Sequence, residues 1–215
     1  MRRCSQFPIP VDGAVNEAPL FALGLTLAWL AGVRVYLTVF GVGLAGLLGW
    51  IDLPPALQAC TSTWVLVTAG TLALVEFGAD KIPGVDTGWD LLHTLLRIPA
   101  GAFLAAATLS PDGHLGGGAL LLGGATALTS HALKTGTRAL INTSPEPLSN
   151  WSASLGEDAL SLGALALVFT HPWLALVLIV LALTLVFALV LWLFRTLLRH
   201  PRKHPGRSRG AAEGA

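Results

Sequence analysis

The sequence predicts an all-α, polytopic bundle of membrane helices, and three observations support this prediction. Of the 215 residues, 53% are hydrophobic and only 12% are charged, whereas a soluble domain carries about 25% charged residues. Apolar runs approaching or exceeding the roughly 20 residues that a bilayer span requires recur along most of the chain. The basic residues are also unevenly distributed, because six of the thirteen lie between residues 195 and 209. The two cysteines are too few and too far apart to indicate a disulfide framework or a metal cluster.

The apolar runs define six segments, at residues 20–50, 62–79, 86–109, 116–141, 151–169 and 172–198. The first and last exceed the length of one span, so we expect them to tilt, bend or project, and the glycines at 41, 43, 46 and 49 indicate a break late in the first. The third segment can cross only if its charged half is shielded inside the protein. Some segments could therefore be re-entrant or interfacial, and four spans with re-entrant segments fit nearly as well.

The distribution of charge predicts how the chain is oriented. Lysine and arginine accumulate on the cytoplasmic side of membrane proteins. The tail at 200–215 is basic, and the segment at 1–19 begins with Arg2 and Arg3 and has no signal-peptide core. We therefore expect both termini in the cytoplasm, a disordered tail, and one helical membrane domain at 20–199. The expected external connections, at 51–60, 110–115 and 170–172, contain neither lysine nor arginine.

Seven ionisable side chains crowd into residues 76–97 of this otherwise apolar chain. Charge is costly in lipid, so such groups usually mark a functional interior. On a helix, Asp86, Asp90, His93 and Arg97 would share one face, because they are four, three and four residues apart, and Asp86 is a candidate N-cap. Leucines at 91, 92 and 95 would face lipid or a neighbouring helix. The alternative is an amphipathic helix lying at the membrane surface.

The fourth and fifth segments contain a second polar group. His131, Lys134 and Arg138 share a face of the fourth, and a proline-containing loop at 142–150 follows. The fifth segment carries Glu157 and Asp158 within its apolar run. An acidic pair at that depth needs cationic partners, and the available ones are the arginine at 34, the lysine at 134 and the arginine at 138. We also expect the loops at 80–86 and 142–150 to fold inward and meet.

Together these observations give a set of candidate residues for a solute or ion pathway. They are Arg34, Glu76, Asp80, Lys81, Asp86, Asp90, His93, Arg97, His131, Lys134, Arg138, Asn142, Ser144, Glu146, Asn150, Ser154, Glu157 and Asp158.

A short similarity suggests an internal repeat. Gly32-Val33-Arg34 in the first segment returns as Gly136-Thr137-Arg138 in the fourth. Repeats at 20–110 and 116–199, with three segments each, would run in opposite directions through the bilayer. Many transporters have this 3+3 inverted arrangement, and two matched identities are a hint of it.

Two longer motifs resemble those of a known family. The run from Glu76 through Ala79-Asp80-Lys81-Ile82-Pro83-Gly84-Val85-Asp86 to Asp90, His93-Thr94 and Arg97 resembles a signature of the uncharacterised domain of unknown function 4126. The run from Asn142-Thr143-Ser144-Pro145-Glu146-Pro147 to Glu157-Asp158 resembles its second signature. The resemblance covers residues 20–170. It implies a multispanning helical protein, which we place in a bacterial inner membrane, and it implies no activity.

Three classes of function remain open. A small transporter or channel for a polar or ionic solute is favoured, because ionisable groups inside a membrane domain usually mark a pathway. A membrane enzyme acting on a lipid or lipid-linked phosphate is the alternative, with Asp80, Asp86, Asp90 and His93 around Mg²⁺. A non-catalytic scaffold is the third. We expect the lipid bilayer as a partner, no nucleic acid, no cofactor and no resident metal; a homo-oligomer is left open.

Overall fold

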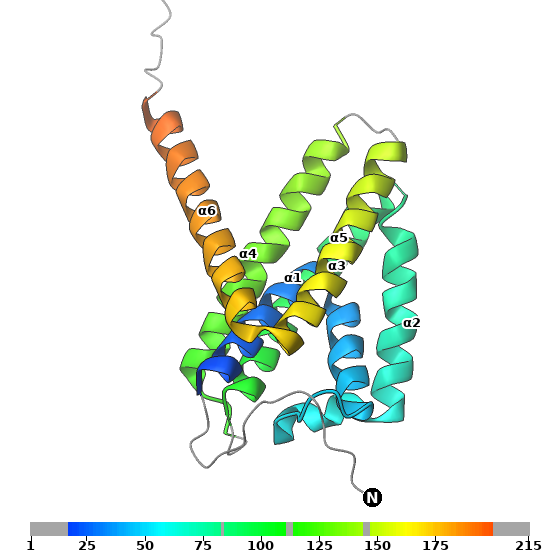
Figure 1. Ribbon diagram of the computed structural model, residues 1–215. Helices are drawn as coiled ribbons and strands as arrows, with labels where there is room; N and C mark the ends of the chain where they lie inside the picture. The colour runs from blue at the N-terminus through cyan, green and yellow to red at the C-terminus, as the bar shows by residue number, and fades with distance from the viewer. Residues whose placement is uncertain (1–16, 83, 111–113, 144–146, 200–215) are drawn as a thin grey trace, which may run out of the picture. The chain divides into compact units, whose positions relative to one another are not determined.

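The computed structural model describes residues 17–82, 84–110, 114–143 and 147–199, and within these ranges it contains helices and no strand. Figure 1 shows the elements in order: α1 (Glu17–Leu47), the 3-10 helix η1 (Pro55–Thr61), α2 (Thr63–Ala79), α3 (Val85–Thr108), α4 (Gly117–Ile141), α5 (Pro147–Thr170) and α6 (Pro172–Arg199). The all-α prediction is confirmed, and each predicted segment contains one α-helix. The predictions for residues 1–16 and for the tail at 200–215 lie outside the described residues.

The chain divides into two compact units, at residues 1–180 and 181–215. The described part of the second unit is the C-terminal portion of α6. It continues the apolar helix α6, and several of its large side chains are exposed, including Leu185 and Phe187. The first unit contains all the other helices and the candidate residues.

Helix α1 is the core of the first unit, because it contacts α2, α3, α4, α5 and η1. Its helical geometry is interrupted at Arg34, where φ is −143° and ψ is 76°. The break expected near glycines 41 to 49 coincides with the end of α1, which stops at Leu47 and is followed by Gly49 at a φ of 67°. Earlier in this run glycine serves close packing, since a Cβ atom on Gly43 would lie 2.2 Å from the carbonyl oxygen of Cys60.

Small residues also bring α1, α3 and α4 close together. A Cβ atom added to Gly32 would lie 1.9 Å from Ser130 Oγ, and one added to Gly101 would lie 2.4 Å from Ala127 Cβ. Gly123 is equally restricted by the backbone of α3. Such contacts allow membrane helices to pack closely where lipid provides no hydrophobic driving force. They hold the charged faces of α3 and α4 near the middle of α1.

Two local predictions need correction. The N-cap of α3 is Gly84, at a φ of 86° that favours glycine, and Asp86 lies inside the first turn. Asp86 still binds the helix start, because its Oδ1 accepts hydrogen bonds from the backbone N–H groups of Gly84 and Thr87. The second loop is shorter than expected, since α5 begins at Pro147. Proline suits the first turn of a helix, where its missing N–H costs nothing.

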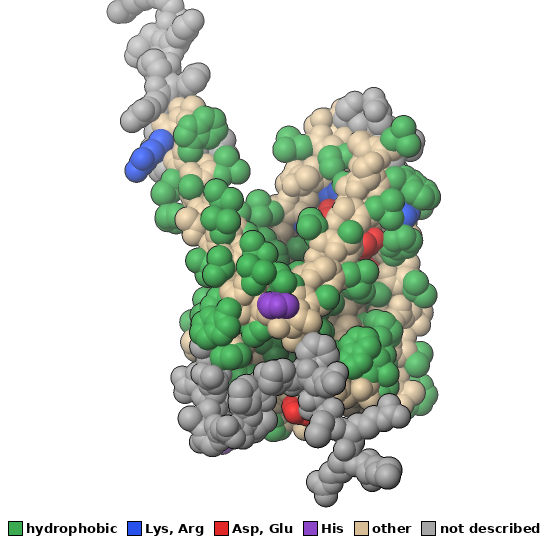
Figure 2. Space-filling view, in the orientation of Figure 1, with side chains coloured by type: hydrophobic (Ala, Val, Ile, Leu, Met, Phe, Trp, Pro, Cys, Tyr) green, Lys and Arg blue, Asp and Glu red, His purple; other side chains and the backbone are tan. Residues whose placement is uncertain are grey.

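Among the described residues, four helices are long and apolar enough to cross a membrane: α1, α3, α5 and α6. A fifth span results if η1 and α2, which meet at a bend of 68°, cross together. The weak third segment is thus a continuous 24-residue helix. Hydrophobic side chains cover much of the described surface in Figure 2. The chain is an integral membrane protein, and Leu91, Leu92 and Leu95 face outward as predicted.

Candidate functional site

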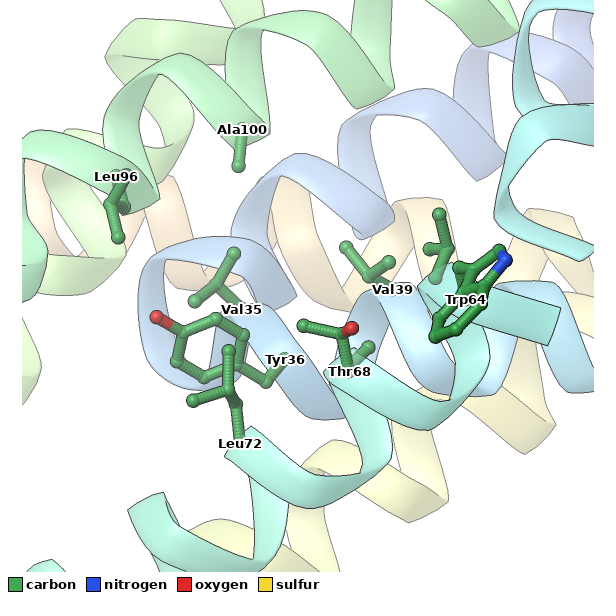
Figure 3. A pocket seen from close by; sticks show the side chains of 10 residues that line it. Val35, Tyr36, Val39, Trp64, Thr68, Leu72, Leu96 and Ala100 are labelled. Atoms are coloured by element: carbon green, nitrogen blue, oxygen red, sulfur yellow. The ribbon is translucent and has the colours of Figure 1, made fainter. Parts of the chain in front are cut away.

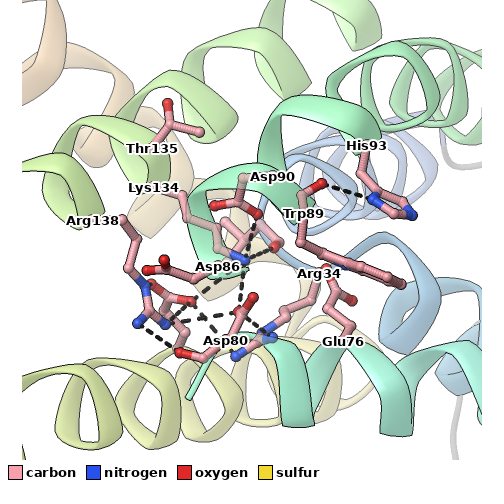
Figure 4. Close-up of polar contacts among 12 residues, drawn as sticks. Arg34, Glu76, Asp80, Asp86, Trp89, Asp90, His93, Lys134, Thr135 and Arg138 are labelled. Atoms are coloured by element: carbon pink, nitrogen blue, oxygen red, sulfur yellow. Dashed lines mark hydrogen bonds and ion pairs between the residues drawn. The ribbon is translucent and has the colours of Figure 1, made fainter. Parts of the chain in front are cut away.

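Charged side chains from five helices meet inside the first unit and form what we call the ion-pair network, and Figure 4 shows Arg34, Asp80, Lys134 and Arg138 among its members. Its basic members come from α1, α3 and α4, and its acidic members come from α2, the residue that ends α2, α3 and α5. They are Arg34, Arg97, Lys134, Arg138, Glu76, Asp80, Asp90, Glu157 and Asp158. The four basic side chains are at most 2% exposed. The sequence therefore folds its scarce charges inward, against the alternative of an amphipathic surface helix.

Asp80 connects the first helix with the fourth. It ends α2 and is fully buried. Its Oδ2 lies 2.5 Å from Arg34 Nη1, 2.9 Å from Lys134 Nζ and 3.7 Å from Arg138 Nη2. Three basic groups from two helices therefore surround one carboxylate oxygen. This residue fixes the relative positions of α1, α2 and α4.

Arg97 is the centre of a second cluster. Its guanidinium contacts Glu76 Oε1 through Nη2 and Asp90 Oδ1 through Nη1, the latter at 2.7 Å. Nη1 also lies 3.1 Å from His131 Nδ1. Because a guanidinium only donates, Nδ1 must accept, so His131 is neutral and carries its proton on Nε2. That Nε2–H donates to Thr94 Oγ1 at 2.7 Å.

The acidic pair of α5 has the partners that the sequence predicted. Asp158 Oδ1 lies 2.9 Å from Arg34 Nη2. Arg138 donates to both carboxylate oxygens of Glu157, at 3.1 and 3.0 Å. Ser154 accepts a hydrogen bond from Arg34 at 3.3 Å. Charges from the first, fourth and fifth segments are thus joined, as expected.

The two polar loops also meet. Asn142 Nδ2 donates to both carboxylate oxygens of Asp86, at 3.2 and 3.1 Å. Asn150 donates to Asn142 Oδ1 at 3.1 Å, although Asn150 belongs to α5 rather than to a loop. Arg138 Nη1 reaches the backbone oxygens of Asp80 and Asn150 at 3.2 Å each. Ser144 and Glu146 lie outside the described residues.

Two candidate residues stand apart from the network. His93 Nδ1 lies 2.8 Å from the carbonyl oxygen of Trp89, and its ring stacks on that indole and meets the edge of Tyr36. Lys81 donates to the carbonyl oxygen of Phe77 and places its ammonium over the Phe77 ring. Partial burial lowers the pKa of Lys81 below its ordinary value. Lys81 joins none of the ion pairs among the described side chains.

The sequence analysis missed Thr94, which connects the helices α3 and α4. Its hydroxyl donates to the carbonyl oxygen of Asp90 at 2.9 Å and accepts from His131. Its position four residues after Asp90 is the spacing that selected the charged residues, so the same criterion applied to hydroxyl groups would have found it.

An apolar pocket of about 420 Å³ lies between α1, α2 and α3 (Figure 3). Its lining residues are Val35, Tyr36, Val39, Trp64, Val65, Thr68, Ala69, Leu72, Leu96 and Ala100. Tyr36 belongs both to this pocket and to the aromatic contact with His93. The pocket lies next to the polar interior, but no charged side chain is among its lining residues.

The proposed magnesium ligands are not assembled. Within the described ranges, no group of three or more His, Cys, Asp and Glu side chains is arranged to hold a metal ion. Asp80 and Asp90 each contact basic groups through one oxygen. His93 faces the aromatic side chains instead of the carboxylates. The four proposed ligands are therefore not gathered around one point among the described residues.

The fold and the network define a class: a multispanning helical membrane protein with ion pairs buried in its interior. Within this class, the family model of the domain of unknown function DUF4126 matches residues 21–192. The chain belongs to this family, as its motifs indicated. No curated protein and no solved structure matches it.

Proposed function

We propose that this chain is a small transporter or channel that moves a polar or ionic solute through the interior of its helix bundle. The observation that carries the proposal is the ion-pair network, in which buried charges from five helices converge. Each charge removed from water costs several kcal/mol, which pairing only partly offsets. A bundle that needed only stability would be better served by apolar contacts at these positions, so the retained charges favour a pathway.

Interrupted helices support the same function. Helix α1 loses its helical geometry at Arg34, and the turn between α2 and α3 leads directly from Asp80 to Asp86. Irregular backbone at membrane depth is tolerated where it is buried in protein or lines a cavity. Transporters use such broken helices to build their sites.

The orientation and the repeat are part of the proposal. We place the chain in a bacterial inner membrane with both termini in the cytoplasm. The basic tail agrees with this orientation, which puts Lys81 on the same side. An inverted repeat is supported by Arg34 and Arg138, which approach the same oxygen of Asp80. The matching glycines are not equivalent in packing, since a Cβ atom on Gly32 would collide with α4 while one on Gly136 meets no described atom within 4 Å.

Flux measurements on the purified full chain in liposomes test the proposal. The panel consists of protons, sodium, potassium, chloride and phosphate. We expect flux above that of empty liposomes for at least one of these ions, and at least a tenfold reduction in Asp80→Asn. Leu95→Ala is the matched control, because this side chain is 81% exposed and lies on the opposite face of α3 from the network.

Two outcomes would separate the alternatives. Folded wild-type protein that moves no member of the panel, and whose melting temperature responds to none of them, contradicts the transporter and favours the scaffold. Co-purification of a stoichiometric membrane protein would support the scaffold directly. Equal flux in the wild type and in Asp80→Asn would show that the network is not the pathway.

A further inference from the structure

Four carboxyl groups are fully buried among the described residues, and they do not share the buried basic groups equally. They are those of Glu76, Asp80, Asp86 and Asp90, and the buried basic side chains are the four of the ion-pair network. The side chains of Glu157 and Asp158 are partly exposed, at 17% each. A carboxylate that is buried in a low-dielectric interior with too few partners is neutralised by a bound proton.

The carboxyl groups of the polar interior differ in the number of donors that they contact. Asp80 and Asp90 each have at least two basic groups on one oxygen. Asp86 accepts from two backbone N–H groups and from Asn142. Glu157 receives a donor from Arg138 on each oxygen. Every one of these four carboxyl groups therefore contacts at least two donor atoms.

Glu76 and Asp158 differ from these four. Each has a basic group on one oxygen, and that basic group is shared with another carboxylate. The second oxygen of each is buried and has no hydrogen-bond partner among the described residues. The same holds for Asp80 Oδ1 and Asp90 Oδ2, but there the first oxygen contacts at least two basic groups. Asp158 is 17% exposed, and the positive charge of Lys81 acts on it. Glu76 is 1% exposed, and Arg97 is the one basic group with which it forms an ion pair among the described residues.

We propose that Glu76 holds an exchangeable proton, and that H⁺ is the ion that moves through this network, alone or together with a solute. This inference rests on the transport function proposed above. The proton binds at Oε2 and neutralises the carboxylate, while Oε1 continues to accept from Arg97. Arg97 then keeps Asp90 as its ionised partner. Only the O–H bond forms or breaks.

The surroundings of Glu76 explain why binding or loss of its proton would affect the whole ion-pair network. The charged and titratable groups that act on it come from every neighbouring helix: Arg34 and Tyr36 from α1, Asp80 at the end of α2, Arg97 from α3 and Lys134 from α4. Loss of the proton gives Arg97 two ionised partners at once. Nη1 of Arg97 also contacts His131 on α4. A change in the charge of Glu76 would therefore reach α4 through two direct side-chain contacts.

Infrared spectroscopy of the full chain in nanodiscs tests this directly. We expect a protonated-carboxyl C=O band in the wild type that shifts in D₂O and decreases as the pH is raised. The band should be lost in Glu76→Gln and kept in the matched variant Asp158→Asn. Absence of the band at every accessible pH, or its persistence in Glu76→Gln, overturns the proposal. The wild-type spectrum keeps the test decisive even if a variant does not fold.

Thermal unfolding gives a second, independent readout. Glutamine has the shape and charge of protonated glutamate, so Glu76→Gln should keep a melting temperature within about 3 °C of the wild type at neutral pH. Asp90→Asn removes an ionised partner of Arg97 and Lys134 and should lower the melting temperature by more than about 5 °C. Equal, large losses in both variants would mean that Glu76 is ionised and purely structural.

Proton flux separates this inference from the function on which it rests. Dye-monitored flux into liposomes that is present in the wild type and lost in Glu76→Gln supports both. If the infrared band is present but no ion or solute flux is measured, the proton on Glu76 is supported and the transport function is overturned. Proton flux unchanged in Glu76→Gln, or flux of sodium or potassium with no proton movement, overturns the role of Glu76 and leaves transport standing.

Discussion

Replacing Gly32 with alanine should destabilise the protein, although alanine is the better helix former. The added Cβ would lie 1.9 Å from Ser130 Oγ and 2.3 Å from the carbonyl oxygen of Ala127. Ser130 cannot move away freely, because it donates to the carbonyl oxygen of Trp29 at 2.8 Å. Overpacking costs about 1–3 kcal/mol, and loss of that hydrogen bond adds about 1 kcal/mol. We therefore expect a loss of about 2–4 kcal/mol.

Gly136, in the run that resembles Gly32-Val33-Arg34, provides the control. A Cβ on Gly136 meets no described atom within 4 Å, so Gly136→Ala should be neutral or should stabilise by up to about 1 kcal/mol through helix propensity. Unfolding of the two purified variants in mixed micelles measures both values. Wild-type stability in Gly32→Ala, or equal losses in both variants, would refute the packing of α1 against α4 described above.

Three further changes test other parts of the structure. Arg138→Met should cost about 3–5 kcal/mol in unfolding free energy, because it leaves Glu157 without its bidentate donor; a loss below 1 kcal/mol would contradict this. Leu95→Ala should change stability by less than about 0.5 kcal/mol, since the side chain is 81% exposed. Thr87→Cys and Asn142→Cys, combined in a chain whose native cysteines are replaced by alanine, should form a disulfide on mild oxidation. The two side chains are in contact, because Asn142 Nδ2 lies 3.1 Å from Thr87 Oγ1. A cysteine pair at 95 and 142 is the negative control.

Much of the polar interior could be predicted from helical spacing alone. Asp90 and Arg97 were expected on one face of a helix, and they are both buried on the same face of α3. Glu157 and Asp158 were expected to find basic partners, because an unpaired acidic pair in an apolar run is costly. Periodicity and charge neutralisation are local properties, so the sequence carries them directly.

The partner of each charge could not be predicted in the same way. Nothing in the sequence distinguishes Asp80, which contacts three basic groups, from Asp86, which is held by N–H donors and an amide. That difference depends on how closely α1 approaches α4 and on the turn after α2. The interruption at Arg34 was missed for a related reason, since neither proline nor glycine occupies that position and only tertiary contacts impose the change.

The interruption at Arg34 leaves carbonyl oxygens of α1 to be satisfied by side chains. Lys134 donates to the carbonyl oxygen of Val33 at 3.3 Å, and Thr38 donates to the carbonyl oxygen of Arg34 at 2.7 Å. The same lysine forms an ion pair with Asp80. A single side chain thus connects the backbone of α1 at its interruption with the end of α2, so a change in the charge of Asp80 would bear directly on the backbone of α1.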